Sequence, residues 1–205
     1  MELQRLTLKM RRGATNVTPI RVESGKWIYV TITAVAQTAP LRITAPGHGL
    51  PDNWRAAIMN VKSVGDFAAA NNPPKDAELH TVTVIDADTI EVNGINGAAF
   101  RAHTGGGQLA YREPLDLSPY NGVRMDVKAK INGESLLHLA EGAGLRLDST
   151  ERAVWFEPTV EQSMVLPAKN YVFDIELLRT EGGGVDPICA ADSTLVVTPE
   201  TTTTE

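Results

Sequence analysis

Apolar and polar residues alternate with a period of two along much of this 205-residue chain. The pattern is clear in four stretches, RLTLKM (5–10), WIYVTIT (27–33), RMDVKAKI (124–131) and YVFDIELL (171–178). Side chains of a β-strand point alternately to its two faces, so each stretch predicts a strand with one face on a core and the other in water. Such strands are typical of antiparallel sheets. In the third stretch the inner face is predicted to carry Met125, Val127, Ala129 and Ile131.

A β-hairpin is predicted in TVTVIDADTIEVNG (81–94), where Val82 and Val84 mirror Ile90 and Val92 around an Asp-Ala-Asp turn. Long helical periodicity is missing. VGDFAAANN (64–72) and TVEQSMVL (159–166) can each form one or two helical turns, and ESLLHLAEG (134–142) fits either a strand or a short helix. Many short strands joined by Gly and Pro turns predict an all-β fold.

Two places along the chain suggest domain boundaries, one near Trp27–Tyr29 and the other in HTGGGQLAYREP (103–114). The two strands expected before residue 27 are too few to be stable alone, so they need partners after residue 114. We therefore predict a β-sandwich formed by residues 1–27 and 113–198 and interrupted by an inserted β module, residues 28–112, whose ends lie close together. The polar end of the chain, residues 199–205, is predicted to be a flexible tail.

Composition narrows the classes of partner. The formal net charge is −6 and like charges do not cluster, which argues against sequence-independent binding of nucleic acid. Cys189 is the single cysteine and cannot form an internal disulfide. No stretch approaches the ~20 apolar residues of a membrane span, and the first residues lack the apolar core of a signal peptide. We expect no membrane partner.

Gly47-His48-Gly49 raises the question of catalysis or metal binding. A metal ligand needs two or three partners, and the other histidines, His80, His103 and His138, are scattered without ligand-like spacing. A general base needs a nucleophile and an orienting group, and neither is implied nearby. The glycines instead predict a sharp turn in which the imidazole bonds the backbone.

Four further features allow both a functional and a structural interpretation. Cys189 lacks a neighbouring cation that would activate it, so a buried position is favoured. Asp86 and Asp88 are too few oxygen ligands for calcium and favour a hairpin turn. The run Lys9–Arg12 could contact phosphate or an acidic partner, but a solvated strand edge is favoured. A sugar-binding platform is less favoured than core or interface positions for the three tryptophans, Trp27, Trp54 and Trp155.

These considerations predict no catalytic residue, no metal site and no cofactor, and hence a protein that is not an enzyme. A glycosidase stays open as a disfavoured alternative, because its two carboxylates need not be close in sequence.

The middle of the chain resembles a small β-barrel module that is common in bacteriophage virion proteins. The resemblance rests on Gly47-His48-Gly49-Leu50, Val64-Gly65, Asn71-Asn72 and the hairpin at residues 81–92. That module is related to the first catalytic-cysteine half-domain of ubiquitin-activating enzymes, in which it carries no catalytic cysteine of its own. The resemblance implies a small β-barrel for residues 28–112.

The flanking segments resemble an immunoglobulin-like module found at the N-termini of phage baseplate and tail proteins. The segments that carry the resemblance are EPLDLSPYNGVRMDVK (113–128), GLRLD (144–148), YVFDIELLRTEGGGV (171–185) and LVVTPETT (195–202). One departure is GGGVDPICAADSTLVV (182–197), where such modules carry a simpler strand. The resemblance implies an immunoglobulin-like β-sandwich.

Together the two resemblances imply a non-enzymatic structural protein of a bacteriophage virion, in the tail, baseplate or fibre-attachment apparatus. Its expected partners are other virion proteins and copies of itself, and its expected location is the virion, assembled in the host cytoplasm. Two alternatives stay open. One is a capsid decoration protein, and the other is a carbohydrate-binding module that contacts a glycan on the host surface.

Overall fold

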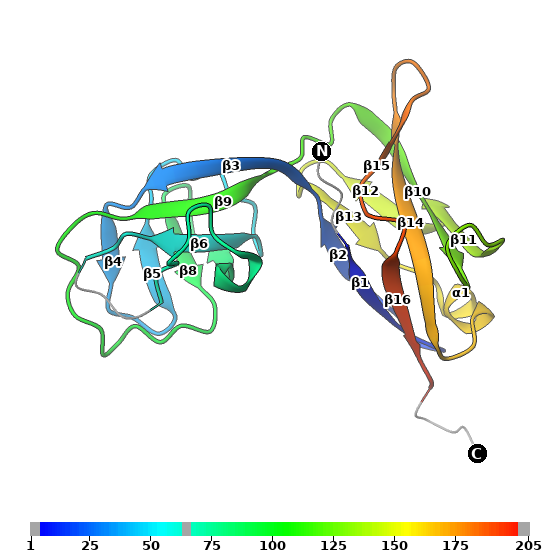
Figure 1. Ribbon diagram of the computed structural model, residues 1–205, viewed down its shortest axis with the longest axis horizontal. Coiled ribbons are helices and arrows are strands. Elements are labelled where there is room, and N and C mark those ends of the chain that lie inside the picture. The colour runs from blue at the N-terminus through cyan, green and yellow to red at the C-terminus, as the bar shows by residue number, and fades with distance from the viewer. Residues whose placement is uncertain (1–4, 63–66, 201–205) are drawn as a thin grey trace. The chain divides into compact units, whose positions relative to one another are not determined.

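The computed structural model, shown in Figure 1, describes residues 5–62 and 67–200. The chain forms two compact units. Unit 1 consists of Met1–Val22 and Leu115–Glu205, and unit 2 consists of Glu23–Pro114. The sequence predicted these boundaries after residues 27 and 112, so the inserted unit is longer than expected at both of its ends.

Unit 1 contains nine strands and one short helix among its described residues. The strands are β1 (Thr7–Arg11), β2 (Thr18–Arg21), β10 (Tyr120–Lys128), β11 (Ser135–Glu141), β12 (Gly144–Asp148), β13 (Ala153–Phe156), β14 (Asn170–Arg179), β15 (Val185–Pro187) and β16 (Ser193–Thr198). They pair in the order β1-β16-β14-β10-β11-β12-β13-β2, and β15 pairs with β14 beside this path. All pairs are antiparallel except β1 with β16 and the brief contact of β11 with β12.

The sheet of unit 1 curls around one hydrophobic core. Strands from both ends of the order contribute to this core, including Met10 on β1, Ile20 on β2 and Phe156 on β13. The central strands β10 and β14 alternate as the sequence predicts, and on β14 the inward residues are Tyr171, Phe173, Ile175 and Leu177. The fold is therefore all-β and sandwich-like, which confirms the predicted fold class.

Unit 2 contains seven strands and one 3-10 turn among its described residues. They are β3 (Glu23–Thr31), β4 (Ala34–Ala36), β5 (Leu41–Thr44), β6 (Arg55–Met59), η1 (Asp76–Glu78), β7 (His80–Val84), β8 (Thr89–Val92) and β9 (Gln108–Pro114). The strand order is β3-β9-β6-β7-β8-β5-β4. The hairpin of β7 and β8 has the predicted register, with Val82 opposite Val92 and Val84 opposite Ile90.

The two ends of this strand order are consecutive along the chain, which closes the sheet. Only Ile32 and Thr33 separate β3 from β4. The Ile32 amide donates to the Gly107 carbonyl beside β9 over 3.0 Å, and the Thr33 amide donates to the Thr44 carbonyl on β5 over 2.9 Å. One extended segment thus pairs with β9 along its first part and with β5 along its second. The result is a small barrel around its own core, which includes Trp54, Leu41 and Ile43.

A bulge explains why the boundary lies at Val22 rather than at Trp27. Glu23 pairs with Pro114 and Trp27 pairs with Arg112, so the register shifts between these two rungs. Gly25 has a φ of 86° within this stretch. The extra residues break the alternation of apolar and polar side chains, and the first part of β3 was therefore not recognisable from the sequence.

Other local predictions differ from the structure in identifiable ways. The prediction that Ala129 and Ile131 face inward is wrong: β10 ends at Lys128, and Ile131 is 49% exposed in the following turn. The segment 159–166 does form a helix, α1 (Val160–Val165), whose N-terminus is capped by Thr159 and Gln162. The ambiguous segment 134–142 is a strand, β11. Of the other predicted helical segment, residues 64–66 lie outside the described residues and residues 67–72 are not helical.

We expect unit 2 to fold when it is expressed alone as residues 23–114, because its core and its strand pairing are complete within those bounds. A fragment with the sequence-predicted bounds, 28–112, lacks Glu23, whose carboxylate accepts a hydrogen bond from Arg55 over 2.8 Å. Its free energy of unfolding should be lower by about 1.5–3 kcal/mol, the contribution of hydrogen bonds to charged groups. Amide NMR dispersion and urea unfolding measure both fragments, and Glu23→Gln in the longer one separates the ion pair from strand length. An undispersed spectrum for residues 23–114 would contradict the boundaries.

Candidate functional site

His48 lies in the turn between β5 and β6 and is only 2% exposed. Its Nδ1 accepts a hydrogen bond from the Leu50 amide over 3.1 Å. Its Nε2 lies 3.1 Å from the Asp86 carbonyl oxygen, so Nε2 carries the ring proton and donates it there. Gly47 and Gly49 have φ values of 66° and 63°, which a residue with a Cβ rarely adopts. The sequence prediction of a β corner held by an imidazole is confirmed.

The tip of the β7–β8 hairpin holds the same corner from the other side. The Asp88 amide donates to Oδ1 of Asp86 over 2.9 Å, which is the turn predicted from the sequence. Oδ1 of Asp88 in turn accepts from the Gly47 amide over 2.9 Å. The Tyr111 hydroxyl donates to the His48 carbonyl oxygen. Both nitrogens of the imidazole and both aspartates are therefore engaged in building the turn.

We expect His48→Ala to lower the free energy of unfolding by about 1–3 kcal/mol, because the buried Leu50 amide and the Asp86 carbonyl lose their partner. His103→Ala is the matched control, since the His103 ring bonds a backbone carbonyl in an exposed loop. Chemical denaturation and metal analysis measure both variants. Stoichiometric zinc in the wild type that is lost in His48→Ala would contradict the structural role.

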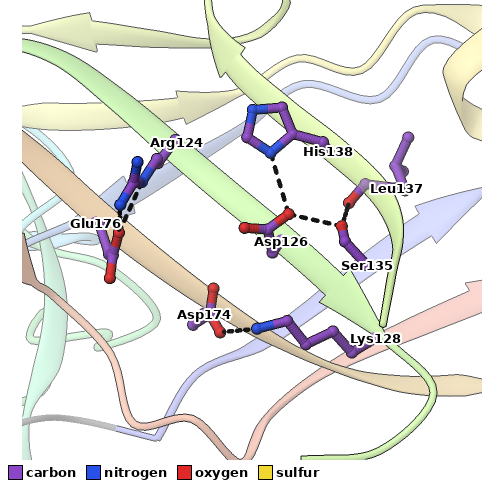
Figure 2. A network of polar contacts seen from close by, with 8 residues as sticks. All are labelled: Arg124, Asp126, Lys128, Ser135, Leu137, His138, Asp174 and Glu176. Atoms are coloured by element: carbon purple, nitrogen blue, oxygen red, sulfur yellow. Dashed lines mark hydrogen bonds and ion pairs between the residues drawn. The ribbon is translucent and has the colours of Figure 1, made fainter. Parts of the chain in front are cut away.

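Figure 2 shows a polar network on the outer face of β10, β11 and β14. Arg124 and Glu176 lie directly opposite each other on β10 and β14, with Nη2 and Oε2 2.6 Å apart. Lys128 Nζ lies 2.7 Å from Asp174 Oδ2. Asp126 is opposite Asp174 in the β10–β14 ladder and opposite His138 in the β10–β11 ladder. These cross-strand pairs stabilise the sheet, and the two facing aspartates each have a donor of their own.

The network brings together a serine, a histidine and an aspartate, but not in a catalytic arrangement. Ser135 Oγ lies 2.6 Å from Asp126 Oδ1, and His138 Nδ1 lies 3.0 Å from the same oxygen (Figure 2). A hydrolytic triad needs the imidazole between the hydroxyl and the carboxylate, so that it can take the hydroxyl proton. Here the carboxylate lies between the two donors, and the arrangement ties β10 to β11.

The protonation of the network fits this structural role. Burial alone would raise the pKa of Asp126, but the hydrogen bonds from Ser135 and His138 outweigh it and hold that pKa below its ordinary value. The hydrogen bond with Asp174 raises the pKa of the Lys128 ammonium, against a smaller opposing effect of desolvation. Asp126 is therefore ionised and Lys128 charged at neutral pH, so neither is poised to exchange a proton.

The remaining residues singled out from the sequence lie at separate places. Cys189 is 2% exposed, as predicted, and burial raises the pKa of its thiol. Lys9 is exposed on the end strand β1, as predicted for a strand edge. Trp54 is a core residue whose Nε1 donates to the Arg112 carbonyl over 2.9 Å. Trp27 and Trp155 are half-buried, and each lies 5.1 Å from the guanidinium of an arginine.

A surface loop of unit 2 was not recognised from the sequence as a candidate. Residues 67–79 begin beside β6, where the Ala69 amide donates to the Ile58 carbonyl over 2.7 Å. They reach β3, where the Tyr29 hydroxyl lies 3.1 Å from Asn72 Oδ1. Ala57 and Ala110 pair with each other on β6 and β9 and are fully buried, although they alternate with residues of the barrel core and so face away from it. The signal in the sequence is the run NNPPKDAE, which indicates a loop but not its anchor.

Glu78 is the anchor of this loop. Its carboxylate accepts hydrogen bonds from the amides of Lys75, at 2.7 Å, and Ala70, at 2.8 Å, and from the Asn71 side chain at 2.9 Å. These bonds, that of Lys75 first, lower the pKa of Glu78 to about 2. The loop is thereby held in one conformation next to two aromatic residues on the outer face of β3. Trp27 and Tyr29 have ring centroids 6.5 Å apart, and Tyr29 is 40% exposed.

We expect the loop to keep its structure down to low pH. The folded-state pKa of Glu78 is below its unfolded value of about 4.5, so the stabilisation is complete above that value and is lost as the pH falls towards about 2. In Glu78→Gln the amides of Ala70 and Lys75 should exchange faster with solvent, and this pH dependence should vanish. NMR hydrogen exchange between pH 2 and 6 measures it. Asp76→Asn removes a neighbouring charge and is the control; an equal effect in that variant would contradict the role of Glu78.

Among residues 5–62 and 67–200, no three His, Cys, Asp or Glu side chains are grouped closely enough to hold a metal ion. Within the same part of the chain, no helix is both long and apolar enough to cross a membrane.

No protein-family model matches the sequence, and no curated protein matches it. The described surface offers a loop anchored by Glu78 beside Trp27 and Tyr29 on unit 2, and a sheet with an end strand on unit 1.

Proposed function

We propose that this chain is a structural component of a bacteriophage virion, located in the tail, the baseplate or the fibre-attachment apparatus. It acts through protein–protein packing and carries out no catalysis. Its partners are other virion proteins and copies of itself.

The proposal rests mainly on one observation. The histidine, aspartate and serine side chains that could take part in catalysis are instead bonded to turns and neighbouring strands. His48, Asp86 and Asp88 build a turn, and Ser135 and His138 both bond the carboxylate of Asp126. Side chains that are engaged in this way stabilise strands and corners. A protein built so interacts through its surfaces and strand edges rather than through a reaction centre.

The build of the chain from two units also supports the proposal. The Gly47–Leu50 turn and the hairpin at residues 81–92, which carry the resemblance to a phage barrel module, contact each other directly. The segments that resemble the baseplate module include β10, β12 and most of β14 and β16, which are strands of unit 1. A barrel inserted into a sandwich gives one subunit two separate surfaces for assembly.

Mass spectrometry of purified phage particles, separated into heads and tails, tests the proposal. We expect peptides of this chain in the tail fraction, in a constant ratio to the other tail proteins. A non-structural replication protein of the same phage is the control for contamination. Absence of the chain from intact particles would refute the proposal, and its presence only in heads would favour the capsid decoration protein instead.

The aromatic surface of unit 2 favours a second candidate, a module that binds a host-surface glycan. Trp27, Tyr29 and the anchored Asn72 offer ring faces and an amide, the groups that usually contact sugars. Tryptophan fluorescence should then change on addition of host glycans, and Tyr29→Ala should abolish the change. Trp155→Phe, in unit 1, is the matched control. No change with any glycan would leave the structural role as the function.

A further inference from the structure

β1 is the first strand of the unit 1 sheet, and β16 is its neighbour on one side. The pairing is parallel, with Thr7 opposite Thr194 and Arg11 opposite Thr198. In a parallel ladder every second residue of a strand bonds to a given neighbour. The Thr194 amide donates to the Leu6 carbonyl over 2.8 Å, and the Arg12 amide donates to the Thr198 carbonyl over 3.1 Å. Even-numbered residues of β1 therefore face β16.

The odd-numbered residues of β1 direct their amides and carbonyls away from the sheet. At Arg11 these backbone groups are bonded by the Asn16 side chain. Asn16 Oδ1 accepts from the Arg11 amide over 2.7 Å, and Asn16 Nδ2 donates to the Arg11 carbonyl over 2.9 Å. Within the described part of the chain, the backbone groups of Thr7 and Lys9 have no such partner. We call this stretch, Thr7 to Lys9, the β1 edge.

The other sheet ends are poorer sites for strand addition. β2, at the opposite end of the unit 1 order, contains Pro19, which lacks an amide donor. β15, beside β14, is three residues long and ends in Pro187. The sheet of unit 2 closes on itself through β3 and β4. Unpaired backbone groups on an edge can accept a strand from another chain.

We propose that the β1 edge receives an extended strand of a partner protein that carries a carboxylate opposite Lys9. The inference deepens the proposed function, because it names the surface and the chemistry of assembly, and it rests on that proposal only for the source of the partner. Backbone hydrogen bonds supply the attachment, as in other cases of strand addition. The side chains of the edge supply the preference for charge.

The charges of the edge favour an acidic partner over a second copy. Lys9 is exposed and lies in no ion pair that the structure describes, whereas Arg5, which precedes β1, bonds Asp192. If two copies joined β1 to β1 about a two-fold axis, Lys9 would face Lys9, Arg5 or Arg11 of the other copy in three registers and Thr7 in a fourth. Like charges directly opposite each other destabilise a strand pair, and an opposite charge stabilises it.

The test uses the full chain and a displayed library of random octapeptides. Selected peptides should carry Asp or Glu at the position opposite Lys9, with β-branched residues next to it. Thr7→Pro removes an outward amide that has no hydrogen-bond partner among the described residues, and should weaken binding of a selected peptide at least tenfold. Thr7→Val keeps the amide and should bind like the wild type. Lys9→Glu should weaken binding of the acidic peptides and shift the selection to basic ones.

Hydrogen exchange locates the contact without relying on a substitution. In the free protein the amides of Thr7 and Lys9 should exchange fast, whereas those of Leu8 and Met10 should be protected. The acidic peptide should protect Thr7 and Lys9. Peptides without acidic enrichment, binding unchanged in Thr7→Pro, or protection confined to other residues would overturn the inference. So would a dimer of the chain that Thr7→Pro dissociates, because a second copy would then occupy the edge.

The outcome is independent of the particle experiment. A chain found in tails that binds no acidic strand would leave the proposed function in place and end this inference. If the chain is absent from particles but its β1 edge still binds acidic strands, the proposed function is refuted and this inference stands.

Discussion

The division of the chain into two units depends on the antiparallel ladder between β3 and β9. Both connections between the units leave from its first rung, where Glu23 is opposite Pro114. The Leu115 amide donates to the Val22 carbonyl over 2.8 Å, so the two segments of unit 1 that lead into and out of unit 2 are paired with each other. The two ends of the insertion are adjacent, so for the sandwich the insertion is equivalent to a short loop between two of its strands.

Charge at this first rung reinforces the ladder. Glu23 is 8% exposed, and its carboxylate oxygens lie 2.8 Å from Arg55 Nη2 and 3.4 Å from Arg112 Nε. A buried carboxylate is costly unless it is paired, so the two arginines are needed to hold it there. They come from β6 and β9, and the pair of contacts therefore fixes three strands of the barrel at the point where the chain enters it.

Local patterns were sufficient to predict the class of fold but not the positions where strands depart from regularity. Alternation identified β1, β10 and β14, and mirrored valines and isoleucines identified the β7–β8 hairpin with its register. The bulge at Gly25 hid the start of β3, and the turn after Lys128 ended β10 earlier than the continuing alternation implied. Both are interruptions of period two, which alternation cannot reveal.

The candidate site also contains one part that could be predicted from the sequence and two that could not. The Gly-His-Gly turn was predictable because its glycines and its histidine are adjacent in sequence. The network around Asp126 was not, because its partners are brought together by strand pairing. The loop anchored by Glu78 was not predictable either, although its partners Ala70, Asn71 and Lys75 are close in sequence. Ser135 and His138 reach Asp126 across the β10–β11 ladder, and Glu78 bonds amides that the sequence gives no reason to orient towards it.

The two units differ in how they can engage other molecules, and the difference follows from sheet closure. Closing the barrel pairs its end strands, so the backbone of unit 2 is occupied and recognition there falls to side chains such as Tyr29 and Asn72 beside the anchored loop. The sheet of unit 1 ends in β1, which leaves backbone groups available. Side-chain surfaces discriminate between ligands, whereas a backbone edge accepts many sequences and depends on a few charges for its preference. The two units therefore offer different modes of recognition, a backbone edge on the sandwich and side chains on the barrel.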